Sequence, residues 1–311
     1  MVPKKEKTIL SRLRTRFGED TLERESEEPV CGSSLPFVFG MSLFVKMRKK
    51  PGNQVNKKEE DVLRLEGKVA VVTGGANGIG VAYSEGLAKE GAKVVVADLD
   101  KKGGEPAVQK INSSGGKAMF VRTDVSIKKD AERMVADTVR SYGSIDVLVN
   151  NAGILFTAPV EETTEEMWDK TFAVNVKGLF FCAQAAAKEM KKQKSGKIIN
   201  ISSIAAIGGQ AGLCAYSSTK GAVLTMTKVF ALELVDYNIQ VNAVLPGTTD
   251  TGMAEQAMKD PEWTRQVTQS IPMKRLGRTT DLLGAVLYFA SSDSDYCTGQ
   301  TLIVDGGYSM I

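Results

Sequence analysis

Short apolar runs rich in valine and isoleucine alternate with longer stretches of helical spacing from Leu65 to the C-terminus. Short β-branched runs are typical of strands, and their alternation with helical patterns predicts βαβ units that build a parallel sheet. Because the runs are almost continuously apolar, we expect the sheet to be buried on both faces. The predicted strands are Val69–Thr73, Lys93–Asp98, Ala118–Arg122, Ile145–Asn150, Lys197–Ser202, Ile239–Leu245 and Thr301–Val304.

The stretch after the fourth predicted strand carries a clear helix signal. Trp168, Phe172 and Val176 recur at every fourth position, which predicts a helix face packed in the core. Thr163 with Glu166 predicts a capping box at the start of that helix. No internal repeat divides the sequence after residue 63. The predicted fold class is therefore α/β, with a single doubly wound domain over residues 64–311 and a seven-stranded parallel sheet.

Residues 1–63 differ in character, because they are highly charged and lack the strand and helix alternation. We predict a flexible N-terminal extension and linker there. Its longest apolar run, Leu35–Val45, is shorter than the roughly 20 residues of a membrane-spanning helix. The acidic run Glu19–Glu28 argues against an organelle-targeting role, although the basic and apolar first turns leave that role open. We expect no membrane partner.

Composition excludes several classes of chemistry. The net charge is +3, and acidic and basic residues balance after residue 63, so we expect no nucleic-acid partner. The four cysteines form no Cys-x-x-Cys pair, which argues against a disulfide framework and suits a cytoplasmic location. The chain contains no histidine, so Ser-His-Asp hydrolysis and His-ligated zinc are excluded, and we expect no metal. Acid and base chemistry must use Tyr, Lys, Asp or Glu.

A glycine-rich turn follows the first predicted strand directly and opens a helical pattern. A tight strand-to-helix turn needs glycine, and a diphosphate must approach bare backbone at a helix N-terminus. This context predicts the phosphate-binding turn of a Rossmann domain. The residues of the turn that we assign to cofactor binding are Gly74, Asn77, Gly78, Ile79 and Gly80.

Asp98 closes the second predicted strand. A carboxylate at this position can accept hydrogen bonds from both hydroxyls of the adenosine ribose, and it repels a 2′-phosphate. Asn77 and Leu99, where a cation could pair with that phosphate, are both uncharged. The sequence therefore favours NAD over NADP as the cofactor.

Tyr216 and Lys220 form a Tyr-x-x-x-Lys pair within a helix predicted over Ala215 to Leu234. This spacing puts both side chains on one helix face, where an ammonium beside a phenol lowers the phenol pKa toward the range useful for proton transfer. Ser203 ends the fifth predicted strand, at the sheet edge where ligands bind in such folds. Asn175 is a poor helix former inside a predicted helix, which invites a functional reason.

With these motifs in order, the chain resembles the short-chain dehydrogenases/reductases of the compact type, from Leu65 to the C-terminus. Three residues between the first two glycines of the motif favour the compact type over the extended one. The resemblance rests on Thr73-Gly74-x-x-x-Gly78-x-Gly80, Asp124, Asn150-Asn151-Ala152-Gly153, Asn175, Ser203, Tyr216-x-x-x-Lys220, and Pro246-Gly247 followed by Thr249 and Thr251.

The resemblance implies an oxidoreductase that interconverts a secondary alcohol and a ketone by hydride transfer. Tyr216 would act as general acid and base, Lys220 would lower its pKa and hold the nicotinamide ribose, and Ser203 would orient the substrate oxygen. Asn175 would fix a water that links Lys220 to solvent. The remaining implied cofactor contacts are Asp124 and Val125 at the adenine, Asn151, Ala152 and Gly153 along the cofactor, and Pro246, Gly247, Thr249 and Thr251 toward the carboxamide.

Several expectations concern the substrate side. A mostly apolar pocket is expected, with Gln210 as a polar contact, and residues 251–278 are expected to form a lid hinged at Gly252 and Pro272. Cys214 is expected in packing, with an oxidation-sensitive thiol as the alternative. The expected pocket walls are Ile154, Leu155, Phe156, Ile204, Leu213 and Met253.

Two alternatives to the general reading stay open. Many relatives of this sequence type are 3-oxoacyl-(acyl-carrier-protein) reductases, and Lys274, Arg275 and Arg278 could form a basic rim for an acidic carrier. Those reductases mostly use NADPH, which Asp98 disfavours. The second alternative is a non-catalytic NAD-sensing protein that kept the fold. The resemblance also implies a homotetramer or homodimer, with a small-molecule alcohol or ketone as substrate.

Overall fold

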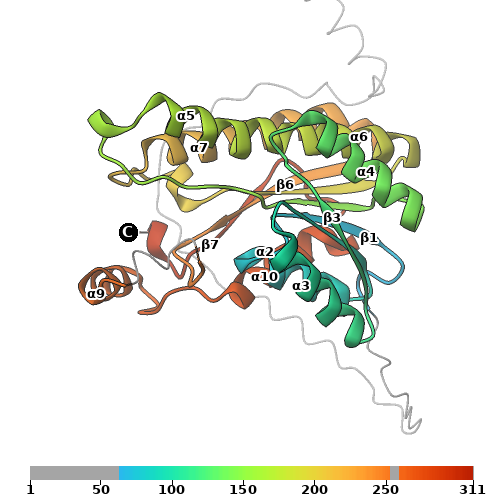
Figure 1. Cartoon of the computed structure of the whole chain (residues 1–311), viewed down its shortest axis with the longest axis horizontal. Coiled ribbons are helices and arrows are strands. Elements are labelled where there is room, and N and C mark those ends of the chain that lie inside the picture. The colour runs from blue at the N-terminus through green and yellow to red at the C-terminus, as the bar shows by residue number, and fades with distance from the viewer. Residues whose placement is uncertain (1–62, 253–258, 311) are drawn as a thin grey trace, which may run out of the picture. The chain divides into compact units, whose positions relative to one another are not determined.

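The computed structural model describes residues 63–252 and 259–310, shown in colour in Figure 1. Residues 1–62, 253–258 and 311 lie outside the described residues. The flexible extension predicted over 1–63 and the boundary after it therefore stay predictions. Across the described ranges, no helix combines the length and the apolar composition that a bilayer crossing requires.

The described residues are built around one seven-stranded sheet, in which every strand pair is parallel. The strand order is β3-β2-β1-β4-β5-β6-β7, so the chain changes direction across the sheet between β1 and β4. This confirms the predicted fold class, a doubly wound α/β domain. The strands are β1 Val69–Thr73, β2 Lys93–Asp98, β3 Lys117–Arg122, β4 Val147–Asn150, β5 Gly196–Ile201, β6 Ile239–Pro246 and β7 Thr301–Val304.

Helices cover both faces of the sheet, with α4, α6 and α7 on one side and α2, α3 and α10 on the other (Figure 1). Alternate residues of β2 enter the two cores, because successive strand side chains point to opposite faces: Val94 and Val96 pack beneath α2, and Val95 packs beneath α4. The helices are α2 Gly78–Lys89, α3 Lys101–Ser113, α4 Lys128–Tyr142, α5 Glu165–Phe172, α6 Leu179–Gln193, α7 Cys214–Leu234, α9 Pro261–Ser270 and α10 Thr279–Ala290.

The fourth strand begins later than predicted, at Val147 instead of Ile145. The Gln193 amide donates to the Ile145 carbonyl at 3.0 Å and accepts from the Ile145 N–H at 3.1 Å. The backbone of Ile145 is thus satisfied by a side chain of α6, so it does not join the strand ladder.

The start of α5 also differs from the prediction. Thr164, one residue later than expected, caps the helix by accepting from the Met167 N–H at 3.2 Å, whereas Thr163 donates to the Pro159 carbonyl. The prediction of a buried Trp168 is wrong. Trp168 is 36% exposed, and its ring stacks on Phe172 with ring centroids 4.9 Å apart.

Burial on both faces holds for the inner strands and is incomplete at the two edge strands, β3 and, more strongly, β7. Leu302 and Ile303 of β7 are 38% and 39% exposed, whereas every residue of β1 and β6 is buried. An apolar run alone does not distinguish an inner strand from an edge strand, which is why the sequence pattern overestimates burial at β7.

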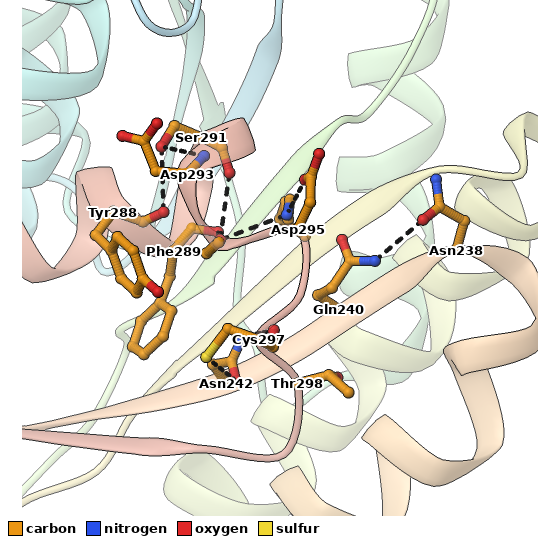
Figure 2. A network of polar contacts seen from close by, with 12 residues as sticks. Asn238, Gln240, Asn242, Tyr288, Phe289, Ser291, Asp293, Asp295, Cys297 and Thr298 are labelled. Atoms are coloured by element: carbon orange, nitrogen blue, oxygen red, sulfur yellow. Dashed lines mark hydrogen bonds and ion pairs between the residues drawn. The ribbon is translucent and has the colours of Figure 1, made fainter. Parts of the chain in front are cut away.

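The loop that leads into β7 is anchored by Asn242 of β6. Its amide donates to the Cys297 carbonyl at 2.7 Å, and its side-chain oxygen accepts from the Gln300 N–H at 3.0 Å. Figure 2 shows the Asn242 side chain beside Cys297, with Gln240 two residues earlier on the strand facing Asn238. Asn242 is 1% exposed, so these bonds replace solvent for two backbone groups.

Replacing Asn242 with Ala should leave the partly buried Gln300 N–H and Cys297 carbonyl without their side-chain partner. We expect the free energy of unfolding to fall by about 2–3 kcal/mol in urea denaturation. Gln240→Ala is the matched control, because its amide bonds the Asn238 side chain and no backbone group. That control should lose less than about 1 kcal/mol. Equal losses in the two variants would contradict the anchoring role of Asn242.

Candidate active site

Two adjoining cavities open at the carboxyl ends of the strands. The glycine-loop cavity, about 790 Å³, lies along the turn after β1 and the ends of β2, β3 and β4. The Tyr216 cavity, about 620 Å³, lies along the ends of β5 and β6 and the start of α7. They share walls at Ile79, Asn151, Gly153, Leu155 and Thr251. This is the edge of an open α/β sheet at which ligands bind.

The glycine turn brings bare backbone to the N-terminus of α2, which begins at Gly78. Gly74 has φ +63° and Gly78 has φ +54°, in the left-handed region that glycine adopts without strain. A side chain at Gly80 would collide with the Gly74 carbonyl, so the helix packs directly against the turn. The cavity therefore meets unpaired helix N–H groups, which suits a diphosphate.

A set of hydrogen bonds, here called the Thr73–Asn151 clasp, joins the ends of β1 and β4. The Thr73 hydroxyl accepts from the Asn151 N–H at 3.0 Å and from the Ala152 N–H at 3.1 Å, and it donates to the Val149 carbonyl. The Asn151 amide donates to the carbonyls of Thr73 and Gly74, both at 3.0 Å. The clasp fixes the glycine turn against the loop after β4.

Asp98 lies at the far end of the glycine-loop cavity, where its carboxylate organises the surrounding loops. It accepts from the Ala76 N–H and from the Asp100 N–H, both at 3.0 Å. Asp100 in turn accepts from the Asn77 amide at 3.0 Å, a bond that holds the pKa of Asp100 below its usual range. Two carboxylates thus stand at this end of the cavity.

Tyr216 and Lys220 face the same cavity from one side of α7. The Lys220 Nζ lies 5.5 Å from the centroid of the Tyr216 ring and donates to the Ile201 carbonyl at 2.9 Å. Ser203 follows β5, and its hydroxyl hydrogen-bonds to the Tyr216 phenol and accepts from the Ala205 N–H at 3.1 Å. A phenol, an ammonium and a hydroxyl therefore converge at the cavity wall.

Burial controls the protonation of this group. It lowers the pKa of Lys220 to about 8, because the charged ammonium loses its water. Burial also raises the pKa of Tyr216, and the hydrogen bond from Ser203 lowers it in part. Desolvation of the phenolate thus outweighs the Ser203 hydrogen bond at Tyr216, and a lowering of its pKa by the Lys220 ammonium stays a prediction.

Asn175 lies behind the site, in a single stretch of π-helix over Ala173–Gly178. Its side-chain oxygen accepts from the Ile154 N–H at 2.8 Å, and its amide donates to the Ile154 carbonyl at 2.9 Å and to the Thr219 hydroxyl at 3.1 Å. The amide thus pins the loop after β4 to α7. π-helical turns are frequent at functional sites, and here the turn carries the residue that the sequence marked as unusual for a helix.

Comparison with known proteins places the chain in a family. A family model described as Enoyl-(Acyl carrier protein) reductase matches residues 74–309. The chain is 40% identical over 247 residues to a 2,5-dichloro-2,5-cyclohexadiene-1,4-diol dehydrogenase of Sphingobium indicum, covering 79% of this chain and 98% of that relative. The chain belongs to the short-chain dehydrogenase/reductase family. This confirms the resemblance drawn from the motifs.

Two further members of the short-chain dehydrogenase/reductase family frame its chemistry. A 3-oxoacyl-[acyl-carrier-protein] reductase of Thermotoga maritima is 41% identical over 246 residues, covering 79% of this chain and 99% of the relative. A gluconate 5-dehydrogenase from Burkholderia cenocepacia, solved with NADP and tartrate, has a TM-score of 0.78 at 33% identity, covering 81% of this chain and 98% of that one. Membership makes the chain an oxidoreductase acting on CH–OH groups.

The structure brings most of the predicted site residues of this short-chain dehydrogenase/reductase to the two cavities. Ser203, Tyr216 and Lys220 line the Tyr216 cavity, whereas Asn175 lies behind it and Gly80 packs inside the turn. The predicted cofactor residues at the glycine-loop cavity are Gly74, Asn77, Gly78, Ile79, Asp98, Leu99, Asp124, Val125, Asn151, Ala152 and Gly153, and those at the Tyr216 cavity include Pro246, Gly247, Thr249 and Thr251.

The predicted pocket walls are only partly right. Leu155, Ile204, Leu213 and Gln210 line the Tyr216 cavity, while Ile154 lines the glycine-loop cavity. Phe156 lines neither of these cavities, and its ring lies 5.9 Å from the Lys170 Nζ. Met253 falls outside the described residues, as does part of the predicted lid, so lid closure at Gly252 and Pro272 stays a prediction.

Two side-chain expectations are corrected. Cys214 is exposed at the first residue of α7, so it does not pack in the core. Of the predicted basic rim, Arg275 pairs with Asp281 and lines a separate cavity, and Lys274 donates to the Gln269 carbonyl at 2.7 Å.

The sequence analysis singled out no individual residue of one wall of the Tyr216 cavity, although the lid predicted over 251–278 includes part of that wall. Trp263, Val267 and Ser270 reach it from α9, and Tyr308 reaches it from the C-terminal turn. Trp263, Val267 and Ser270 share one helix face by their spacing, which was the available signal. Nothing in the local sequence indicates that Tyr308 folds back to this cavity.

Proposed function

We propose that the chain is an NAD(H)-dependent oxidoreductase that interconverts a secondary alcohol and a ketone, with Tyr216 as general acid and base. The observation that carries this proposal is the convergence of Tyr216, Lys220 and Ser203 on a cavity that adjoins the glycine-loop cavity. Retention of all three groups argues against a protein that only senses NAD. A secondary alcohol of moderate size fits the largely apolar wall.

The residues of the site divide the work of proton transfer. Tyr216 donates its proton to the carbonyl oxygen in reduction and removes the alcohol proton in oxidation. Ser203 orients the substrate oxygen toward the phenol. Lys220 stabilises the phenolate, since an ammonium in a water-poor site acts strongly on a nearby charge. When bound, the nicotinamide supplies or accepts the hydride.

The glycine-loop cavity suits a dinucleotide. The turn at Gly74 and Gly78 would hold the diphosphate at the start of α2, and Asp98 would hold the adenosine ribose. Asp124 and Val125 would meet the adenine, and the backbone of 151–153 would line the cofactor. Tyr216 and Lys220 would meet the nicotinamide ribose. The carboxamide end would be held by Pro246, Gly247, Thr249 and Thr251.

We favour NAD over NADP on charge. No Lys or Arg is found among the described residues lining the glycine-loop cavity, whereas the Asp98 carboxylate lies on its wall and Asp100 stands next to it. The nearby Lys102 acts on the Asp100 carboxylate and lowers its pKa. A 2′-phosphate would thus meet negative charge. The gluconate 5-dehydrogenase solved with NADP shows that related proteins take the other cofactor.

Three finer expectations stay proposals. The side-chain amide of Asn175 is hydrogen-bonded to Ile154 and Thr219, so we assign Asn175 a positioning role. A water relay through Asn175 from Lys220 to solvent stays a prediction. Assembly as a homotetramer or homodimer is supported by the exposed apolar residues of β7. A cytoplasmic location stays a prediction as well.

The alternative of a reductase for acyl-carrier substrates gains no support from the predicted basic rim, because Arg275 pairs with Asp281 and lines a cavity other than the Tyr216 cavity.

Tyr216→Phe should remove the transferable proton and keep the ring. We expect turnover to fall at least about a hundredfold, the usual share of general acid–base catalysis, with NAD affinity little changed. Steady-state kinetics and NAD titration measure the two effects. Tyr237→Phe, at a 40% exposed tyrosine outside the Tyr216 cavity, is the control and should keep full turnover. Near-normal turnover in Tyr216→Phe would refute the assigned role.

The pH dependence follows from the raised pKa of Tyr216. The neutral phenol is the acid that ketone reduction needs, and the phenolate is the base that alcohol oxidation needs. We therefore expect kcat/KM for oxidation to rise with pH and that for reduction to fall. Ser203→Ala removes the hydrogen bond that lowers the Tyr216 pKa, so the rise in oxidation should move to higher pH. A pH profile that Ser203→Ala lowers without shifting would contradict this coupling.

Cofactor choice is tested at Asp98 and Leu99. Asp98→Ser with Leu99→Arg removes a carboxylate and adds a cation at a side chain that is 50% exposed. We expect the ratio of kcat/KM with NADP to that with NAD to rise at least about a hundredfold. Leu99→Arg alone keeps the Asp98 carboxylate, so it should raise the ratio of kcat/KM with NADP to that with NAD by a smaller factor. A wild-type enzyme that prefers NADP would overturn the NAD assignment.

A further inference from the structure

Helix α9 presents two different faces. Trp263, Val267 and Ser270 line the Tyr216 cavity and follow one another at intervals of four and three residues. The charged and amide side chains of α9 bond one another on a different face. Arg265 donates to Glu262 at 2.6 and 2.9 Å and to Gln269 at 3.1 Å, and Gln266 donates to Glu262 at 2.8 Å. The helix therefore offers the cavity an apolar stripe and keeps its charges in a closed network.

The cavity as a whole is almost free of charge. Of the described residues that line it, Lys220 is the one that is charged at neutral pH, and its Nζ is engaged by the Ile201 carbonyl beside the Tyr216 ring. A carboxylate or phosphate on the part of the substrate away from Lys220 would thus lose water without gaining a counter-ion, which is costly.

Neutral polar groups are available instead. The Gln210 amide is half-buried at the wall and has no hydrogen-bond partner among the described residues. The hydroxyls of Thr157 and Tyr308 line the same space. An amide or hydroxyl recognises a second neutral oxygen on a substrate, because it can donate to a carbonyl or accept from a hydroxyl.

Resting on the proposed function, we propose that the substrate is a compact, uncharged and largely apolar secondary alcohol or ketone whose distal oxygen is bound by Gln210. Its apolar body lies against Trp263, Val267 and Leu155. The protein discriminates against anionic substrates of equal size, in contrast with the gluconate 5-dehydrogenase of similar fold, whose named substrate carries a carboxylate.

The test uses two substrates of one shape that differ in charge. We expect kcat/KM for trans-4-hydroxycyclohexanecarboxamide to exceed that for trans-4-hydroxycyclohexanecarboxylate at least about a hundredfold, at saturating NAD and pH 8. Glucitol and gluconate form a second, polar pair, and the neutral member should again be preferred. Anionic members used as well as, or better than, their neutral partners would overturn the inference and leave the proposed function standing.

Charge reversal at the wall sharpens the test. Gln210→Arg places a cation in the cavity and should raise kcat/KM for the carboxylate at least about tenfold. Ser270→Arg supplies a cation from an exposed position, in case the first variant folds poorly. Gln269→Arg, at an exposed position of α9 that does not line the cavity, is the matched control and should leave both values unchanged. An equal rise in the control, or no rise in either cavity variant, would contradict the inference. Absence of turnover with every alcohol in the panel would instead contradict the proposed function.

Discussion

The Thr73–Asn151 clasp is the constraint on which the arrangement of the site depends. It joins β1 to β4, the two neighbouring strands at which the sheet order reverses. Chain segments leave such a pair in opposite directions, which opens a crevice at their carboxyl ends. By tying the glycine turn to the loop after β4, the clasp makes the two cavities share a wall, so a ligand in one lies against a ligand in the other.

The second constraint is the buried ammonium of Lys220. Removing an ammonium from water is unfavourable in free energy, and this desolvation lowers the pKa of Lys220 to about 8. A strongly shifted group in a cleft is a functional candidate, and here it lies beside the half-buried Tyr216 phenol, whose pKa is raised. Because the rest of the Tyr216 cavity is neutral, little opposes the field of Lys220. The same neutrality leaves no second cation at the cavity wall to bind an anionic group on the substrate.

The sequence predicted the sheet and the central residues well, because both follow from local rules. Valine-rich runs fix the strands, and the spacing of Tyr216 and Lys220 fixes their common helix face. Contacts between distant segments were less predictable. The Gln193 side chain takes up the backbone groups of Ile145, so β4 begins two residues later than predicted. The N-cap of α5 is Thr164, one residue after the predicted one.

Other features depend on surroundings that no local pattern encodes. The placement of α9 and Tyr308 at the Tyr216 cavity comes from the way the C-terminal segments fold back over the sheet edge. The raised pKa of Tyr216 arises from burial, which the helical spacing with Lys220 does not encode. The prediction that β7 is buried on both faces was wrong for a similar reason, because an edge strand has the same composition as an inner strand.

The central claim is hydride transfer to the carbon of a ketone with a proton delivered by the protein. Reduction of a neutral ketone with NADH carrying deuterium at both C4 positions tests it most directly, with the product read by mass spectrometry and NMR. The account predicts one deuterium on the carbinol carbon of each alcohol formed and an exchangeable proton on its oxygen. An alcohol without deuterium at that carbon, or NADH binding with no reduction of any ketone, would contradict it.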